Sequence, residues 1–165
     1  MELTDNVRIF VDCHVFDGAP QGTTTYLHGL YSALIKNKKF TFYFAAHNLA
    51  ALRTIFGTHE NVVYLRYRSS NKFYRLLIDT PRLIRKNAID FAHFQYVVPP
   101  IKRCKYIVTV HDVLFMDFPQ YFPLTYRLKN KWLFKTSAKF SDVVLTVSNY
   151  SKRQIEKHFN IDNVV

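Results

Sequence analysis

The stretch YIVTVHDVLFMDFPQYFPLTYRLKNKWLFKTSAKFSDVVLTV, residues 106–147, decides the fold of this protein. It begins with an apolar run over 106–110, passes two prolines into a helical pattern over 124–139, and returns to an apolar run over 143–147. Short apolar runs on either side of a long helix indicate buried strands joined by a helical crossover. This stretch therefore predicts a strand–helix–strand unit of a parallel sheet.

The rest of the sequence alternates in the same way. Ser148 is expected to cap a helix that runs to about Phe159, and residues 163–165 resemble the start of a further strand. Pro81 should kink the helix around it, or restart it with Thr80 as the cap. The other predicted strands are residues 7–13, 40–46, 62–65 and 89–94, and the other predicted helices are residues 26–35, 48–56 and 72–86.

Strands that alternate with helices build a parallel sheet with helices on both faces. Right-handed crossovers make this an α/β fold, a Rossmann-like doubly wound domain. The length of 165 residues corresponds to about one domain. We therefore expect residues 1–165 to form a single Rossmann-like domain.

The composition excludes several classes of protein. Hydrophobic residues make up 48% and charged residues 21%, which is typical of globular rather than disordered chains. Two cysteines, Cys13 and Cys104, are too few for a disulfide scaffold. They form no C-x-x-C pair, which excludes a zinc ribbon and a thioredoxin-type site. Residues 1–5 lack the basic and apolar parts of a signal peptide, and no apolar stretch reaches the ~20 residues of a membrane span. We expect a cytoplasmic protein.

The net charge is strongly positive, with 23 basic against 12 acidic side chains, or +11. Such a charge favours an anionic partner but does not choose among nucleic acid, phosphorylated metabolites and a membrane surface. The cations concentrate in residues 66–86 and 127–139. In the second segment four of them recur every four residues, on one face of the predicted helix. That face is either solvated or directed at an anionic partner, and an anionic membrane is one alternative.

Polar residues at the carboxyl ends of the strands are the candidates for chemistry, because ligands of open parallel sheets bind there. His111 and Asp112 follow the strand over 106–110 directly. They could act as a general acid and base, as metal ligands or as hydrogen-bonding groups for a polar substrate. No second cluster of ligands accompanies them, so we expect no metal. The structural alternative is that Asp112 caps the next turn while His111 packs beside it.

The loop after the first strand offers a second candidate site. Gly22 precedes a helix and would let the backbone approach an anion, although a plain turn explains it equally well. His14 lies in the same loop. The G-x-G-x-x-G fingerprint and the P-loop are absent. Cys13 is expected to be a buried structural thiol, and His93 is expected inside the sheet.

Four segments carry a resemblance to a known family. Residues 109–123 (TVHDVLFMDFPQYFP) resemble the motif after the fifth strand in the N-terminal domain of GT4-type, GT-B fold glycosyltransferases. Residues 140–152 (FSDVVLTVSNYSK) resemble the next signature of that family, a strand that ends in V-S-x-x-S and opens a helix. Residues 89–93 (IDFAH) are similar to its I-D-h-h-H strand, and residues 22–26 (GTTTY) fall where it has its first glycine-containing loop.

The resemblance implies one half of a two-domain enzyme. Residues 1–165 would be the N-terminal, acceptor-side domain, and a C-terminal domain absent from this chain would bind most of the nucleotide-sugar. The implied reaction moves a sugar to a glycan or lipid-linked acceptor with retention of configuration, and it requires no metal or other cofactor. It would serve polysaccharide or glycolipid assembly, in the cytoplasm or peripherally on the inner face of the membrane. This chain by itself would be inactive.

The resemblance also implies roles for particular residues. His111 and Asp112 would be the catalytic pair beside the reaction centre, and Gly22 would lie near the donor diphosphate. Apart from the resemblance, Thr23, His14 and Ser148 are further candidate substrate-binding residues.

Two other functions compete with this interpretation. A basic nucleic-acid-binding Rossmann-like module would use the positive charge, but it needs exposed aromatic side chains. The aromatic residues fall in apolar-periodic segments and are expected in the core instead. A nucleotide-dependent oxidoreductase would need the absent glycine fingerprint.

Overall fold

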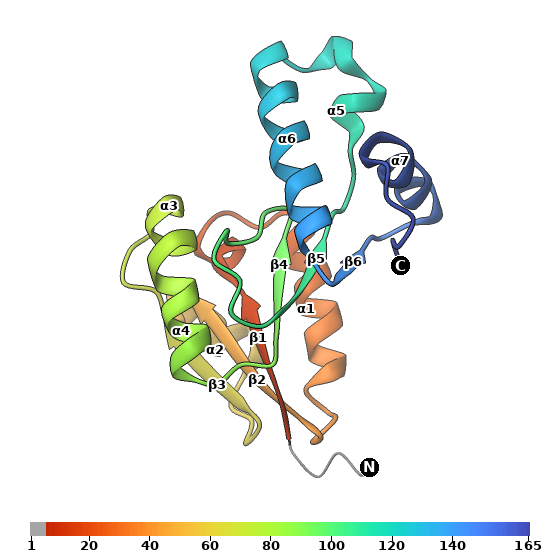
Figure 1. Cartoon of the computed structure of the whole chain (residues 1–165). Helices are drawn as coiled ribbons and strands as arrows, with labels where there is room; N and C mark the ends of the chain where they lie inside the picture. Colours follow the sequence, from red (N-terminus) through yellow and green to blue (C-terminus); the bar gives the residue numbers. More distant parts are fainter. Residues whose placement is uncertain (1–5) are drawn as a thin grey trace. The chain divides into compact units, whose positions relative to one another are not determined.

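The computed structural model describes residues 6–165 and contains a six-stranded sheet flanked by helices (Figure 1). The strand order is β3-β2-β1-β4-β5-β6, and the pairs β1–β2, β1–β4, β2–β3 and β5–β6 are parallel. The predicted Rossmann-like, doubly wound α/β fold is confirmed. The strands are β1 (Val7–Asp12), β2 (Phe40–Ala46), β3 (Val62–Arg66), β4 (Phe91–Gln95), β5 (Lys105–Thr109) and β6 (Val143–Leu145).

The chain divides into two compact units. Among the described residues, the first unit comprises 6–93 and 99–105, and the second unit comprises 94–98 and 106–165. The division runs through β4, so each unit carries part of the sheet together with its own helices.

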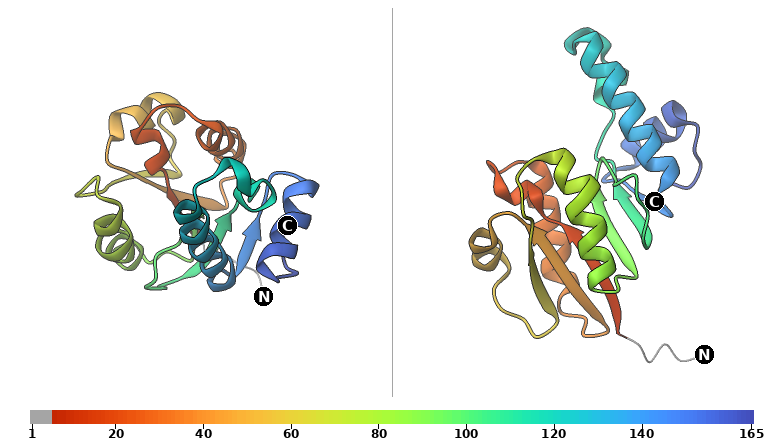
Figure 2. Two further views of the ribbon diagram at one scale, coloured as in Figure 1. Left: turned by 90° about the horizontal axis from the view of Figure 1, so that it is seen from above. Right: turned by 60° about the vertical axis from the view of Figure 1, so that its left-hand side comes forward.

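The first unit is built on an aromatic core. Phe42 and Phe44 of β2 are fully buried against α1 (Gly22–Leu34) and α2 (Leu49–Phe56), which cover the same face of the strands. The helix α4 (Thr80–Lys86) lies on the opposite face from α1 (Figure 2). Side chains alternate between the two faces of a strand, so the aromatic rings at every second position of β2 all pack against these helices.

The helix predicted over 72–86 contains a π-helical turn. It consists of α3 (Lys72–Tyr74), the π segment η2 (Arg75–Asp79) and α4. Thr80 N donates to Arg75 O, five residues back, which is the spacing of a π-helix. The run therefore neither breaks nor takes Thr80 as a cap, because the wider turn lets the helical backbone continue up to Pro81 near the start of α4.

The second unit contains short helices that the sequence patterns did not predict. They are α5 (Leu114–Asp117) and η3 (Pro119–Tyr121), and the first unit has a similar one, η1 (His14–Asp17). Helices of three or four residues are shorter than one period of an amphipathic pattern, which explains why they were missed.

The long elements of the second unit match the prediction closely. The helix α6 spans Leu124–Phe140, and α7 spans Asn149–Phe159. Ser148 Oγ accepts from Ser151 N at 3.1 Å and caps α7 as expected. The further strand expected from residue 163 is reduced to a parallel bridge between Val164 and Val144.

Residues 1–5, on which the expectation of a missing signal peptide depended, lie outside the described residues. Within residues 6–165, no helix combines the length and the apolar character needed to cross a bilayer.

Candidate active site

The first loop presents the N-terminus of α1 with open space in front of it. Gln21 and Thr24 form a capping box, in which Thr24 Oγ1 accepts from Gln21 N at 2.9 Å. Gly22 is the first residue of the helix and is exposed. A Cβ added to Gly22 would have no atom within 4 Å. Packing therefore does not require glycine at this position. A ligand that approaches the backbone closely would require it, because a side chain would stand in its way.

A hollow of about 360 Å³ lies beside this loop, within the first unit. Gly22, Thr23 and His14 are not among the residues that line it. Thr25 and His28 of α1 do line it, and sequence reasoning missed both as site residues. The signal that could have identified them is their helical spacing, which places them on one face near the helix start. The lining residues are Phe16, Gly18, Pro20, Thr24, Thr25, His28 and Ile55.

Asp12, the last residue of β1, is the centre of a buried polar cluster in the first unit. Its Oδ1 accepts from the Tyr67 hydroxyl at 2.9 Å, and lies 3.1 Å from His14 Nδ1 and 3.8 Å from Arg75 Nη1. Burial by itself raises the pKa of the Asp12 carboxyl, but the nearby charges of His14 and Arg75, with hydrogen bonds from His14 and Tyr67, hold it well below its usual range. Asp12 is therefore ionised, and its contacts with Tyr67 and Arg75 connect the end of β1 to the residues after β3.

This cluster corrects one part of the charge interpretation. Arg75, counted among the cations of residues 66–86, is only 7% exposed and lies against Asp12. Arg82 Nη2 lies 3.4 Å from the buried Asp79 carboxylate. Both side chains are thus partners of buried acids, and Arg75 does not contribute to an exposed basic surface.

The second unit brings His111 together with Gln95. His111 follows β5, and its Nε2 lies 2.8 Å from Oε1 of Gln95, the last residue of β4. An amide oxygen only accepts hydrogen bonds, so Nε2 carries the hydrogen and the neutral ring has Nδ1 as its acceptor. Burial lowers the pKa of His111 and outweighs the opposing charge of Asp112. The imidazole is therefore neutral at pH 7.

Tyr96 joins this group, and sequence reasoning missed it. Its ring centroid lies 5.3 Å from that of His111, and it stacks on Phe134 of α6 at 4.7 Å. Its backbone has φ +60°, an uncommon conformation for a bulky residue that occurs preferentially at functional sites. Burial, followed by the charge of Asp112 and a hydrogen bond to it, raises the pKa of the Tyr96 hydroxyl. The hydroxyl thus remains protonated.

Gln95 and Tyr96 carried a sequence signal. They directly follow the strand predicted over 89–94, at the sheet edge where His111 was placed.

Asp112 and Ser148 each make local structural contacts. Asp112 Oδ1 accepts from Leu114 N at 3.2 Å, so this carboxylate holds the turn that leads into α5. Ser148 is engaged in the cap of α7. Of the predicted residues, Gly22, Thr23 and His14 belong to the first unit, while His111, Asp112 and Ser148 belong to the second.

The chemistry available in the second unit is proton transfer and hydrogen bonding. A neutral imidazole held by an amide can accept a proton or bind a hydroxyl, and a protonated phenol can donate. In the part of the chain that the structure describes, no three His, Cys, Asp or Glu side chains gather as a metal site would require.

Comparison with known proteins agrees with this architecture. Residues 20–165 match the model of Glycosyltransferase Family 4. No curated protein matches the chain. A solved structure, titled "Crystal Structure of Glycosyltransferase from Rickettsia africae ESF-5", superimposes with a TM-score of 0.59 at 15% sequence identity. That match covers 98% of this chain and 42% of the other, and at this identity it shows a shared fold.

Proposed function

The chain belongs to Glycosyltransferase Family 4, and on that premise we propose that it is the N-terminal, acceptor-side part of a retaining glycosyltransferase. The proposed reaction moves a sugar from a nucleotide-sugar to a glycan or lipid-linked acceptor, in polysaccharide or glycolipid assembly. The observation that carries the proposal is the family match from residue 20 to the last residue. The neutral His111 held by Gln95 supports it chemically.

Each predicted site residue has a role in this proposal. Departure of a nucleoside diphosphate places negative charge on oxygen, which backbone N–H groups at the N-terminus of α1, beside Gly22, can stabilise. His111 hydrogen-bonds a sugar hydroxyl or the leaving group, and Asp112 shapes the pocket through Tyr96. Thr23, His14 and Ser148 are proposed as further substrate contacts.

The proposal includes a second domain that binds most of the donor. The chain spans 42% of the length of the solved glycosyltransferase that it resembles. The direct test is transfer of a labelled sugar from a panel of nucleotide-sugars, by these 165 residues and by the full-length protein. We expect turnover only by the full-length protein. Turnover by the 165 residues alone would contradict the two-domain proposal, and no turnover by either protein would contradict the transferase.

The proposed partners beyond donor and acceptor include an anionic membrane surface, with the protein peripheral on its inner face. The basic nucleic-acid-binding module remains the second candidate, because two aromatic side chains expected in the core, Trp132 and Tyr121, are exposed, and Trp132 lies beside Lys135 and Lys139. Electrophoretic shift with single- and double-stranded oligonucleotides across a salt series separates this module from the transferase, since only the module is expected to shift them.

Gly22→Ala is expected to slow transfer at least about tenfold without destabilising the protein. The added methyl group meets no protein atom, and alanine is favoured over glycine in a helix by up to about 1 kcal/mol. It would, however, obstruct a diphosphate at the backbone. The measurements are steady-state kinetics with the full-length enzyme and the thermal midpoint of unfolding. Gly29→Ala, also on α1 with no atom within 4 Å of the added Cβ, is the control. Equal kinetics for the two variants would remove Gly22 from the donor site.

A further inference from the structure

The helix α6 exposes a row of large apolar side chains. Leu124, Leu128 and Trp132 follow one another at four-residue spacing and are 60%, 60% and 67% exposed. Tyr121, in η3 just before the helix, is 76% exposed. Residues four apart lie on one helix face, so the three form one ridge. Contiguous exposed apolar surface of this kind marks an interaction site.

The same face carries Lys135 and Lys139 beside Trp132, and no acidic residue occurs between positions 118 and 141 to neutralise them. Lys135 and Lys139 continue the ridge beyond Trp132, at spacings of three and four residues. These two lysines, with Trp132, Thr136 and Phe140, line a shallow hollow of about 430 Å³. The cations of the helix are Arg127, Lys129, Lys131, Lys135 and Lys139.

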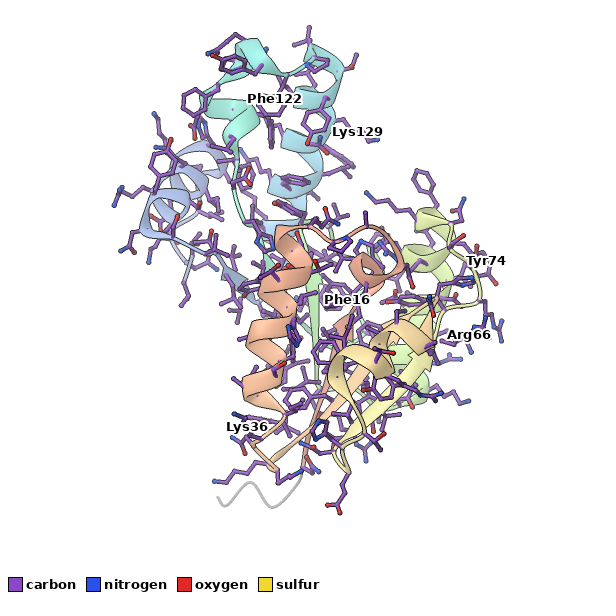
Figure 3. All side chains as sticks on the ribbon, turned by 180° about the vertical axis from the view of Figure 1, so that it is seen from behind. Phe16, Lys36, Arg66, Tyr74, Phe122 and Lys129 are labelled. Carbon is purple, nitrogen blue, oxygen red and sulfur yellow. The ribbon has the colours of Figure 1, made fainter. Side chains whose placement is uncertain are left out.

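The ridge is not needed to hold the helix in place. A different face of α6 packs within the second unit, where Phe134 stacks on Tyr96 and Tyr126 contacts Phe115 at 5.9 Å. Ser137 Oγ accepts from Val98 N at 3.2 Å. Figure 3 shows Phe122 beside the N-terminal part of the helix and Lys129 on the helix itself. Packing therefore explains one face of α6, and the ridge requires another explanation.

We propose that the ridge of α6, defined as Tyr121, Leu124, Leu128, Trp132, Lys135 and Lys139, docks on an anionic lipid bilayer. The inference deepens the proposed function, on whose membrane partner it rests, by naming the surface and its orientation. Leucine and tyrosine at the N-terminal end enter the boundary between headgroups and acyl chains. Trp132 sits at headgroup depth, and the two lysines meet lipid phosphates.

Two observations favour lipid over the alternative anions. Nucleic acid is bound by aromatic platforms and cations, but two of the most exposed residues here are leucines, which stack on no base. The helix has 17 residues and does not qualify as a span, so an interfacial position suits it. Because Phe134 links α6 to Tyr96 and thence to His111, docking would also hold the candidate site close to a lipid-linked acceptor.

Tryptophan fluorescence reports on the ridge alone, because Trp132 is the chain's only tryptophan. Vesicles of phosphatidylcholine with one third phosphatidylglycerol are expected to shift Trp132 emission to the blue and to carry the chain down on sedimentation. Vesicles of phosphatidylcholine alone should do neither, and added salt should weaken binding. Unchanged emission with the anionic vesicles would overturn the proposal. A blue shift caused by oligonucleotides, or by self-association of the chain without lipid, would also overturn it.

Variants test the two chemical components separately. Leu128→Gln is expected to lower vesicle affinity about tenfold, whereas Val63→Gln, which changes an exposed apolar residue of β3, should leave it unchanged. Lys135→Gln with Lys139→Gln should lower vesicle affinity more than tenfold, because each lost cation is expected to lower it about fivefold. Lys36→Gln with Lys39→Gln removes the same charge from the exposed turn after α1 and should change it far less. Equal losses for ridge and control variants would overturn the proposal.

Failure of this inference and failure of the transferase are separable. Vesicle binding is measured without donor or acceptor, so its absence removes the docking surface and leaves sugar transfer to its own assay. Vesicle binding by a protein that transfers no sugar would support the docking surface alone.

Discussion

Replacement of His111 by alanine is expected to reduce sugar transfer by the full-length enzyme by about a hundredfold to ten-thousandfold, the usual contribution of a positioned acid–base group. The structure presents a neutral imidazole whose Nε2–H is held by Gln95, with Nδ1 as the hydrogen-bond acceptor. Alanine removes that acceptor and leaves Gln95 without this contact. The measurement is kcat and kcat/KM for the variant and the wild-type enzyme, with the thermal midpoint as a check on folding.

The pH dependence of transfer distinguishes a role in catalysis from a role in packing. Burial lowers the pKa of His111 from its usual 6.5. The neutral form therefore persists below that pH, and protonation should abolish activity only in more acidic solution. His111→Gln should lose this acidic limb of the profile along with most of the activity. His59→Ala, at a histidine of the loop after α2, is the matched control. An unchanged profile in the His111→Gln variant would show that another group titrates.

Replacement of Asp12 by alanine is expected to lower the free energy of unfolding by about 3–5 kcal/mol, because it leaves the charge of a buried arginine without its partner. Arg75 is almost fully buried, and the Tyr67 hydroxyl loses its acceptor in the same variant. Urea unfolding of the variant and the wild-type chain measures the difference. Glu60→Ala, at an exposed acid, should change stability by less than about 0.5 kcal/mol.

Acid should reproduce this loss in the wild-type chain. The pKa of Asp12 is lower in the folded chain than the usual value of 3.8, so its contribution is complete above pH ~4 and is lost as the pH falls below that value. The Asp12→Ala variant should lack this component of the pH dependence. Combining Asp12→Ala with Arg75→Met should cost less than the sum of the single changes, since the unpaired cation is then absent. Additive losses would show that the two side chains do not interact.

The long elements and their order could be predicted from the sequence because their patterns are local. The aromatic strand over 40–46 and the helix from Asn48 to Phe56 appear with the expected bounds, and the Ser148 cap is confirmed. Each depends on residues within one or two turns of each other. The family resemblance rested on contiguous motifs of the same kind, and the match over residues 20–165 confirms it.

The composition of the site depended on contacts between distant residues. His111 and Asp112 could be identified because they follow a recognisable strand, but Gln95 and Tyr96 come from a different strand end. Asp12, Tyr67 and Arg75 meet across more than fifty residues of sequence. Their charge states follow from burial, which no local pattern reports.

The sequence by itself determined that this is a doubly wound α/β protein of a glycosyltransferase family with a basic helix over 124–139, because periodicity, caps and motifs are encoded by neighbouring residues. Only the tertiary structure decided which side chains that helix exposes and which cations face solvent. It showed Trp132 on the surface and Arg75 in the interior. The physical reason is that exposure depends on which elements pack on a given face, and that packing is decided by residues distant in the chain.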